Sequence, residues 1–159
     1  TYFAIQTRKQ EVFEQLADDG KRIFIRHEVT QHNKKLFQTA KSAGVTQFGK
    51  FNDAGYRGLY GISLSEIERK KEIKKGELLD RAGATELAAN LFRITQTDEK
   101  LKRDNIHGNI HASQVHNMIG GKVRQTIKNI GGTLPEHLLP EKHIKELEKV
   151  QKKIAKQLS

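Results

Sequence analysis

Three histidines in the second half of the chain are the residues best suited to chemistry. His107 and His111 are four residues apart, a spacing that places two imidazoles on one face of a helix, as zinc sites require. His116 follows five residues later. Gly108 and Asn109 weaken a helix there, and the competing interpretation is a solvated loop whose histidines titrate near neutrality. A hydrolase or nuclease using this cluster is therefore our least favoured hypothesis.

Other arrangements that carry catalysis are missing. The chain has no cysteine, which excludes disulfides, a thiol nucleophile and a structural zinc site built on thiolates. No nucleophile has the neighbours that acyl transfer needs, and no glycine-rich stretch matches a nucleotide-binding motif. The carboxylate pairs Glu66/Glu68 and Glu146/Glu148 stand among lysines, as helix ion-pair partners do. We predict a protein that is not an enzyme, with no catalytic residue, metal or cofactor.

The segment Gly55–Gly61 combines glycine, tyrosine and arginine, a combination that can bind nucleic acid. Tyr56 and Tyr60 could stack on bases while Arg57 contacts a phosphate. The alternative, which we favour, is a tight connection whose tyrosine rings close over the core.

The stretch Glu77–Arg103 has the order of a helix-turn-helix motif: a short helix, a glycine turn and a longer helix. On the longer helix, polar side chains at three- and four-residue spacing would share one face, namely Asn90, Arg93, Thr97 and Lys100. Asparagine and arginine are residue types that read bases. Because any solvated helix face shows such residues, we favour a plain helix pair.

The charge of the chain favours an anionic partner, and nucleic acid above others. The formal net charge is +10, and twelve Lys or Arg face five Asp or Glu over residues 100–159, a local surplus of +7. The alternative is a basic domain whose lysines only keep it in solution. The candidate nucleic-acid contacts are Arg93, Lys100, Arg103, Lys122, Arg124 and Lys128.

Helices must position these residues, because three- to four-residue apolar spacing recurs and both prolines come late in the chain. We expect a mainly α protein, an irregular multi-helix bundle whose helical domain covers residues 1–139. The expected helices cover residues 1–17, 21–43, 64–75, 77–82, 85–103, 114–130 and 141–158.

Several boundaries of these helices can be predicted. Asp18–Gly20 should separate the first two helices, and Gly44 should end the second. Ser63–Glu66 fits a capping box at the start of the third. The first helix should turn its apolar side chains inward: Ile5, Val12, Phe13 and Leu16. No cap precedes Thr1, which is not Met, so we expect the chain to be part of a longer protein.

Residues 140–159 should form a terminal amphipathic helix with a narrow apolar seam, made of Ile144, Leu147, Ile154 and Leu158. Packing of this seam against its own domain is the favoured interpretation. A homodimer contact is the alternative, because the seam is narrow enough for a coiled-coil partner.

The sequence shows no feature of a membrane or secreted protein. No run approaches the roughly 18 apolar residues that a span requires. No charged N-terminal segment leads into an apolar stretch. We expect a cytoplasmic protein with no membrane partner.

Taken together, several stretches of this sequence resemble the bacterial DNA-damage-inducible protein D family. They are Thr1–Glu11, Gly83–Thr97 continuing through Glu99–Asp104, Gly120–Ile127 and Gly131–Glu136. The match follows the chain in order over nearly its whole length. Leu134 stands where the family usually has Met, and His143 where a Ser is expected.

This resemblance implies a role in the response to DNA damage, and a two-part protein. A BRO-type N-terminal domain, thought to bind DNA, would precede the region seen here. We therefore expect a non-enzymatic SOS-response protein whose C-terminal helical domain aids binding of DNA, single-stranded DNA included, or modulates a recombination or repair protein on DNA. The alternative is a protein-interaction or dimerisation module, with DNA binding in the N-terminal domain. The resemblance supplies no catalytic residues.

Overall fold

In the computed structural model, residues 1–159 form six α-helices and one short 3₁₀ helix, with no strand. The bounds in chain order are α1 Tyr2–Ser42, α2 Phe48–Tyr60, α3 Leu64–Lys71, α4 Ala84–Arg103, α5 Asn109–Asn129, η1 Pro135–His137 and α6 Ile144–Leu158. The predicted mainly α, multi-helix architecture with a C-terminal amphipathic helix is confirmed. No helix is both long enough and apolar enough to cross a membrane.

The first helix is one continuous rod of 41 residues, and the predicted break at Asp18–Gly20 is wrong. Glycine costs a helix only about 1 kcal/mol relative to alanine, which the turns on either side can offset. Gln15 also donates a hydrogen bond to the Asp19 carboxylate one turn later, at 2.9 Å. The predicted end is confirmed, because Gly44 with φ of +84° follows the last turn.

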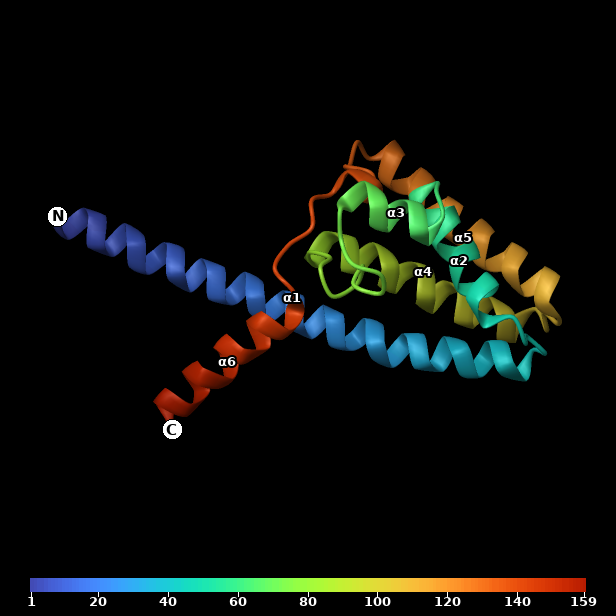
Figure 1. The fold of residues 1–159 in the computed structure, drawn as a ribbon, viewed down its shortest axis with the longest axis horizontal. Helices are drawn as coiled ribbons and strands as arrows, with labels where there is room; N and C mark the ends of the chain where they lie inside the picture. Colours follow the sequence, from blue (N-terminus) through green and yellow to red (C-terminus); the bar gives the residue numbers. More distant parts are fainter.

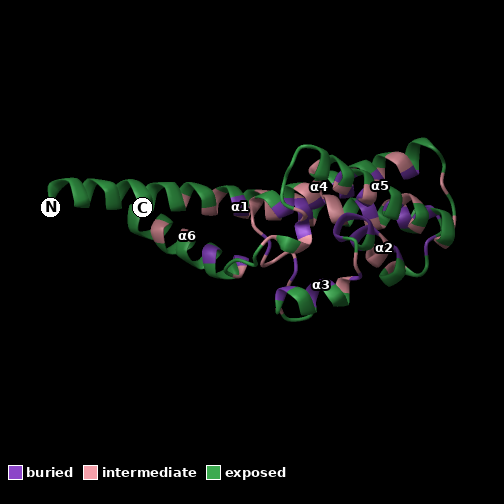
Figure 2. Ribbon diagram, turned by 90° about the horizontal axis from the view of Figure 1, so that it is seen from above, coloured by how far each residue is buried: buried purple, intermediate pink, exposed green.

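The N-terminal half of α1 projects beyond the rest of the molecule (Figure 1). Figure 2 shows the free end of this half exposed on every side, whereas Leu16, Asp19 and Gly20 nearer the body are partly covered. Ile5, Val12 and Phe13, predicted to face inward, are each more than half exposed, and only Leu16 of that set is partly covered. The α1 residues that reach the core come later in the helix and are Arg22, Val29, Leu36 and Ala40.

The body is built from two helix pairs, α4 against the second half of α1 and α5 against α2 (Figure 1). The larger apolar cluster joins side chains of α1 and α4, including Val29, Leu36, Leu87, Ile94 and Leu101. A smaller cluster joins α2, α3 and α5 and includes Leu59, Tyr60, Ile67 and Val123. Leu87, Ile94 and Leu101 thus lie on the side of α4 that faces the core.

Three glycines explain how closely α2 and α5 approach. A Cβ atom on Gly120 would lie 2.7 Å from the carbonyl oxygen of Gly55 and 2.8 Å from the amide nitrogen of Leu59. One on Gly58 would meet the carbonyl oxygen of Asn117. The predicted tight connection at Gly55–Gly61 is wrong, because residues 55–60 belong to α2. The glycines of this segment allow α2 and α5 to touch.

The segment after α2 begins as the sequence predicts. Ser63 caps α3 by accepting from the amide of Glu66, and the Glu66 carboxylate accepts from the Ser63 amide in return, which confirms the capping box. Glu77–Ala82, however, forms turns and not the predicted short helix. The helix-turn-helix interpretation and the favoured plain helix pair are therefore both wrong, since α4 has no preceding partner helix at that position.

The last two α-helices differ from prediction mainly at their starts. Helix α5 begins at Asn109, inside the predicted polar loop, and the Asn109 side chain accepts from the amides of Thr46 and Gln47. Helix α6 begins at Ile144, which is buried together with Leu147. The division of the chain at residues 139 and 140 stays a prediction.

Candidate nucleic-acid interface

Arg93, a predicted nucleic-acid contact, is completely buried in the bundle. Its Nη1 donates to His116 Nε2 at 2.6 Å, and its Nη2 donates to the Asn90 side-chain oxygen at 2.9 Å. The guanidinium also lies 4.8 Å from the centre of the Tyr56 ring, a cation–π contact. Arg93 cannot reach a phosphate, so its assignment as a nucleic-acid contact is wrong.

The network of buried hydrogen bonds around Arg93 continues from Asn90 through the core to α3. Asn90 donates to the Tyr60 hydroxyl at 2.9 Å, and that hydroxyl donates to the Glu86 carboxylate at 2.5 Å. Lys71 pairs with the same carboxylate at 3.2 Å and donates to the Pro135 carbonyl at 2.9 Å. These buried groups satisfy one another, as polar groups inside proteins must.

Burial sets the charge states of the groups in this buried hydrogen-bond network. Burial, and next the charge of Arg93, lower the pKa of His116 to about 3, so the ring is neutral at pH 7. Because a guanidinium only donates, Nε2 of His116 accepts and its Nδ1–H donates to the Phe51 carbonyl at 2.8 Å. Burial raises the pKa of the Glu86 carboxyl, against the opposing effects of Tyr60 and Lys71.

The stacking interpretation of Tyr56 and Tyr60 is also wrong. Both rings are buried, and they pack edge to face with centres 6.0 Å apart. Burial raises the pKa of both hydroxyls. Arg57, the proposed phosphate contact beside them, is exposed but pairs with Asp53 at 2.7 Å. The tyrosine rings do close over the core, from a helix instead of a connection.

The three histidines do not form one site. His116 points into the core, whereas His107 and His111 are exposed. No group of three or more His, Asp or Glu side chains is arranged to hold a metal ion. The hypothesis of a hydrolase built on this cluster is therefore contradicted by the geometry.

The cations of α4 are largely neutralised by neighbouring carboxylates. Lys100 pairs with Asp104 at 2.7 Å, and Arg103 pairs with Asp104 and Glu99 at 3.2 and 3.1 Å. Hydrogen bonds from Lys100 and Arg103 lower the pKa of Asp104, so its carboxylate stays charged. A phosphate would have to compete with these carboxylates for the same donors.

Arg124 has a structural partner as well. It pairs with Glu136 at 2.7 Å and donates to the Leu59 carbonyl at 3.3 Å. Burial acts to raise the pKa of the Glu136 carboxyl, but the hydrogen bonds it accepts and the charge of Arg124 together lower it further, so the net shift is downward. Arg124 thus fastens η1 to α2 and α5.

The outward face of α5 is different, because this 21-residue helix contains no Asp or Glu. Lys122 and Lys128 are exposed on it, and neither takes part in an ion pair. The α5 face, as we call it, consists of the exposed side chains His111, Gln114, Asn117, Lys122, Gln125 and Lys128. It offers hydrogen-bond donors and free cations with no carboxylate to repel a phosphate.

The predicted contacts therefore form two separate groups. Lys122 and Lys128 lie 13 and 19 residues beyond the start of α5, or about 20 and 28 Å along its axis. Lys100 and Arg103 lie at the end of α4, next to that start. Sequence position could not reveal this separation, since it depends on how α4 and α5 turn back on each other.

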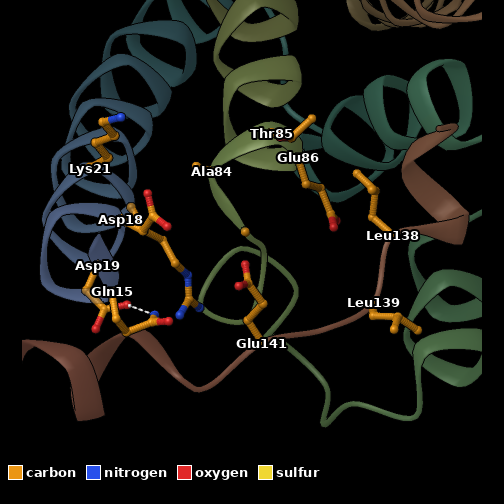
Figure 3. Close-up of a pocket in the computed structure, with 12 residues that line it drawn as sticks. Gln15, Asp18, Asp19, Lys21, Ala84, Thr85, Glu86, Leu138, Leu139 and Glu141 are labelled. Carbon is orange, nitrogen blue, oxygen red and sulfur yellow. Dashed lines mark hydrogen bonds between the residues drawn. The ribbon is translucent and has the colours of Figure 1, made fainter. Parts of the chain in front are cut away.

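A cleft of about 480 Å³ opens between α1, the start of α4 and the segment before α6 (Figure 3). Four carboxylate side chains line it, those of Asp18, Asp19, Glu86 and Glu141, against the cations Lys21 and Arg22. Arg22 is already engaged, since it donates to the carbonyls of Ala82 and Asp80 at 2.8 Å each. The acidic lining makes this cleft a poor site for a phosphate.

Fold and surface together define a helical domain with a basic helix face that is free of carboxylates. The family model described as the DinD C-terminal domain matches residues 16–147. The chain therefore belongs to this family, and the resemblance seen in its sequence is confirmed.

A curated relative places the family more narrowly. The DNA damage-inducible protein D of Escherichia coli (strain K12) is 51% identical over 159 aligned positions. The alignment covers 93% of this chain but only 58% of the relative, so the chain spans little more than half of that protein. The names of the family and of this relative refer to induction by DNA damage, and neither name refers to an enzymatic reaction.

Proposed function

We propose that this protein is a non-enzymatic component of the DNA-damage response whose helical domain binds the backbone of DNA through the α5 face. The name of the E. coli relative supports the damage-response part. The observation that carries the binding part is the α5 face itself, where Lys122 and Lys128 stand free of carboxylates.

The chemistry of this face fits a backbone contact that does not depend on sequence. Lysines on phosphates release counter-ions, which gives affinity that falls steeply with salt. The amide of Gln114 can donate to phosphate or sugar oxygens and so fix orientation. The amides of Asn117 and Gln125 already donate to the Ala54 carbonyl and the Asn129 side chain. Helix α5 contains no Phe, Tyr or Trp, so none of these rings can stack on bases there.

Fluorescence anisotropy with labelled single- and double-stranded oligonucleotides over a salt series tests this function. The Lys122→Gln/Lys128→Gln variant should bind more weakly at every salt concentration. The slope of log K against log salt should shrink by about 2, roughly one for each phosphate that a lysine no longer neutralises. Both side chains are exposed, so the fold should be unchanged.

The matched control is Lys100→Gln/Lys102→Gln, which lowers the net charge equally but removes cations that are paired with Asp104 and Asp98. For this control variant, the slope of log K against log salt should stay close to that of wild-type protein. Equal losses of affinity in both variants would show that overall charge, and not the α5 face, causes binding. No binding of wild-type protein at low salt would disprove the DNA part of the proposal.

A further inference from the structure

The first half of α1 carries an apolar face that nothing in the molecule covers. We call residues 2–20 the arm; it contains five large exposed apolar side chains, Tyr2, Phe3, Ile5, Val12 and Phe13. Phe3 and Phe13 are 82% and 71% exposed. Figure 2 shows that the body covers none of the turns at the free end. A helix that is bare on all sides yet apolar along one side lacks a partner.

Helix α6 also carries an uncovered apolar face, at its C-terminal end. Ile144 and Leu147 are buried, and α6 contacts α1, but Val150 and Leu158 are exposed. Ile144 lines a groove with Ile23 and Phe24 of α1, so the contact lies just beyond the arm. From there the arm and α6 diverge as an open V (Figure 1). Both apolar faces continue outward, uncovered.

Unpaired charges on the two helices are complementary. Arg8 and Lys9 line an apolar groove of about 550 Å³ on the arm together with Ile5, Val12 and Phe13, and neither cation has an ion-pair partner. On α6 the carboxylates of Glu146 and Glu148 are unpaired too. An occupant of the groove should therefore be apolar with acidic neighbours.

The same chain cannot supply these carboxylates. Glu148 lies beside Ile23 and His27 of its own α1, and Lys9 is 14 residues before Ile23, about 21 Å along the helix.

We propose that the arm pairs with α6 of a second copy of this chain, reciprocally, so that two open Vs interlock into a four-helix bundle. With the tip of one arm beside the start of the partner's α6, Lys9 lies near Glu148 of the partner subunit. The arms then run antiparallel under a two-fold axis, and each apolar face is covered once.

The available surface is sufficient for such a dimer. A stable interface buries about 800 Å² on each partner. Large aromatic side chains bury about 150–250 Å² each, so Tyr2, Phe3 and Phe13 together supply more than half of this area. Ile5, Val12, Val150 and Leu158 contribute the remainder.

Sedimentation velocity across protein concentrations, supported by light scattering, tests the dimer. Wild-type protein should be dimeric at micromolar concentration, and Val12→Asp/Phe13→Asp should be monomeric with an unchanged melting temperature of the body. The controls Phe92→Asp and Ile110→Asp alter equally exposed apolar residues outside the arm and should stay dimeric. A monomeric wild type, or a dimer that survives the arm substitutions, would overturn the proposal.

A charge exchange tests which helix occupies the arm. Lys9→Glu and Glu148→Lys should each weaken dimerisation by about tenfold, and the double variant should recover most of that loss. No recovery would show that α6 of the partner is not the occupant. Because DNA binding is assigned to the α5 face, the anisotropy result with Lys122→Gln/Lys128→Gln is independent of this outcome.

Discussion

At the scale of single residues, the core contains a buried cation with no carboxylate beside it. Arg93 is held by His116, Asn90 and the Tyr56 ring, and its Nε atom has no hydrogen-bond partner. Burial lowers the pKa of this guanidinium, but a group with so high an ordinary pKa stays charged. His116 must then stay neutral, because a second positive charge at 2.6 Å would be repelled.

His116 should make the protein sensitive to mild acid. Its pKa is about 3 when folded and 6.5 when unfolded, so below pH 6.5 the unfolded chain binds a proton that the folded chain does not. Stability should therefore fall as pH decreases from 6.5 towards 3, by up to about 1.4 kcal/mol per pH unit. Denaturant unfolding between pH 7 and 5 measures this slope.

The variant His116→Gln isolates the contribution of the imidazole. A glutamine amide can accept from Arg93 but does not titrate, so the variant should have a flatter profile than wild type. Glu86 contributes a pH dependence of the opposite sign, since its raised pKa favours the folded state as the pH falls. This contribution is the same in wild type and variant, because both proteins contain Glu86. Identical profiles would mean that His116 is not the group that titrates.

At the scale of helices, the contact between α2 and α5 depends on glycine. Gly120 faces the backbone of α2, whereas nothing lies within 4 Å of a Cβ placed on Gly121. A side chain is therefore excluded at position 120 but has room at position 121, although the two residues are adjacent in one helix. The sequence shows two glycines in succession and does not reveal which one touches another helix.

Alanine substitution at these two positions should change stability in opposite directions. Gly120→Ala should destabilise by about 1–3 kcal/mol, because backbone atoms of α2 would have to move. Gly121→Ala should stabilise by about 0.4–1 kcal/mol, since alanine restricts the unfolded chain and suits a helix. Thermal unfolding followed by circular dichroism compares them, and a stabilising Gly120→Ala would contradict the close crossing.

At the scale of the whole molecule, Lys71 connects segments that are distant in sequence. It lies on α3, pairs with Glu86 at the start of α4, and donates to the carbonyls of Pro135 and Leu138. Tyr60 of α2 shares the same carboxylate. One ammonium group therefore orients α3, α4 and the segment that leads to α6.

Replacing Lys71 should destabilise the whole fold. Lys71→Met leaves the Glu86 carboxylate buried without its cation, which typically costs about 3–5 kcal/mol. Arg103→Gln removes a cation from exposed pairs and should change stability by less than about 1 kcal/mol. Urea unfolding of both variants measures the difference, and a small effect of Lys71→Met would argue against a buried ion pair.

The sequence by itself determined the helical class, the ends of α1 and α4, the capping box at Ser63 and the family, because these depend on local spacing and on strings of residues. Only the tertiary structure decided which faces are buried. Asn90, Arg93 and Thr97 look like a solvated polar face, yet they lie in the core because α2 and α5 cover them. Ile5 and Phe13 look like a core face, yet they are exposed because no element of this chain reaches the arm. Periodicity specifies that one side of a helix is apolar, but burial depends on what packs against that side.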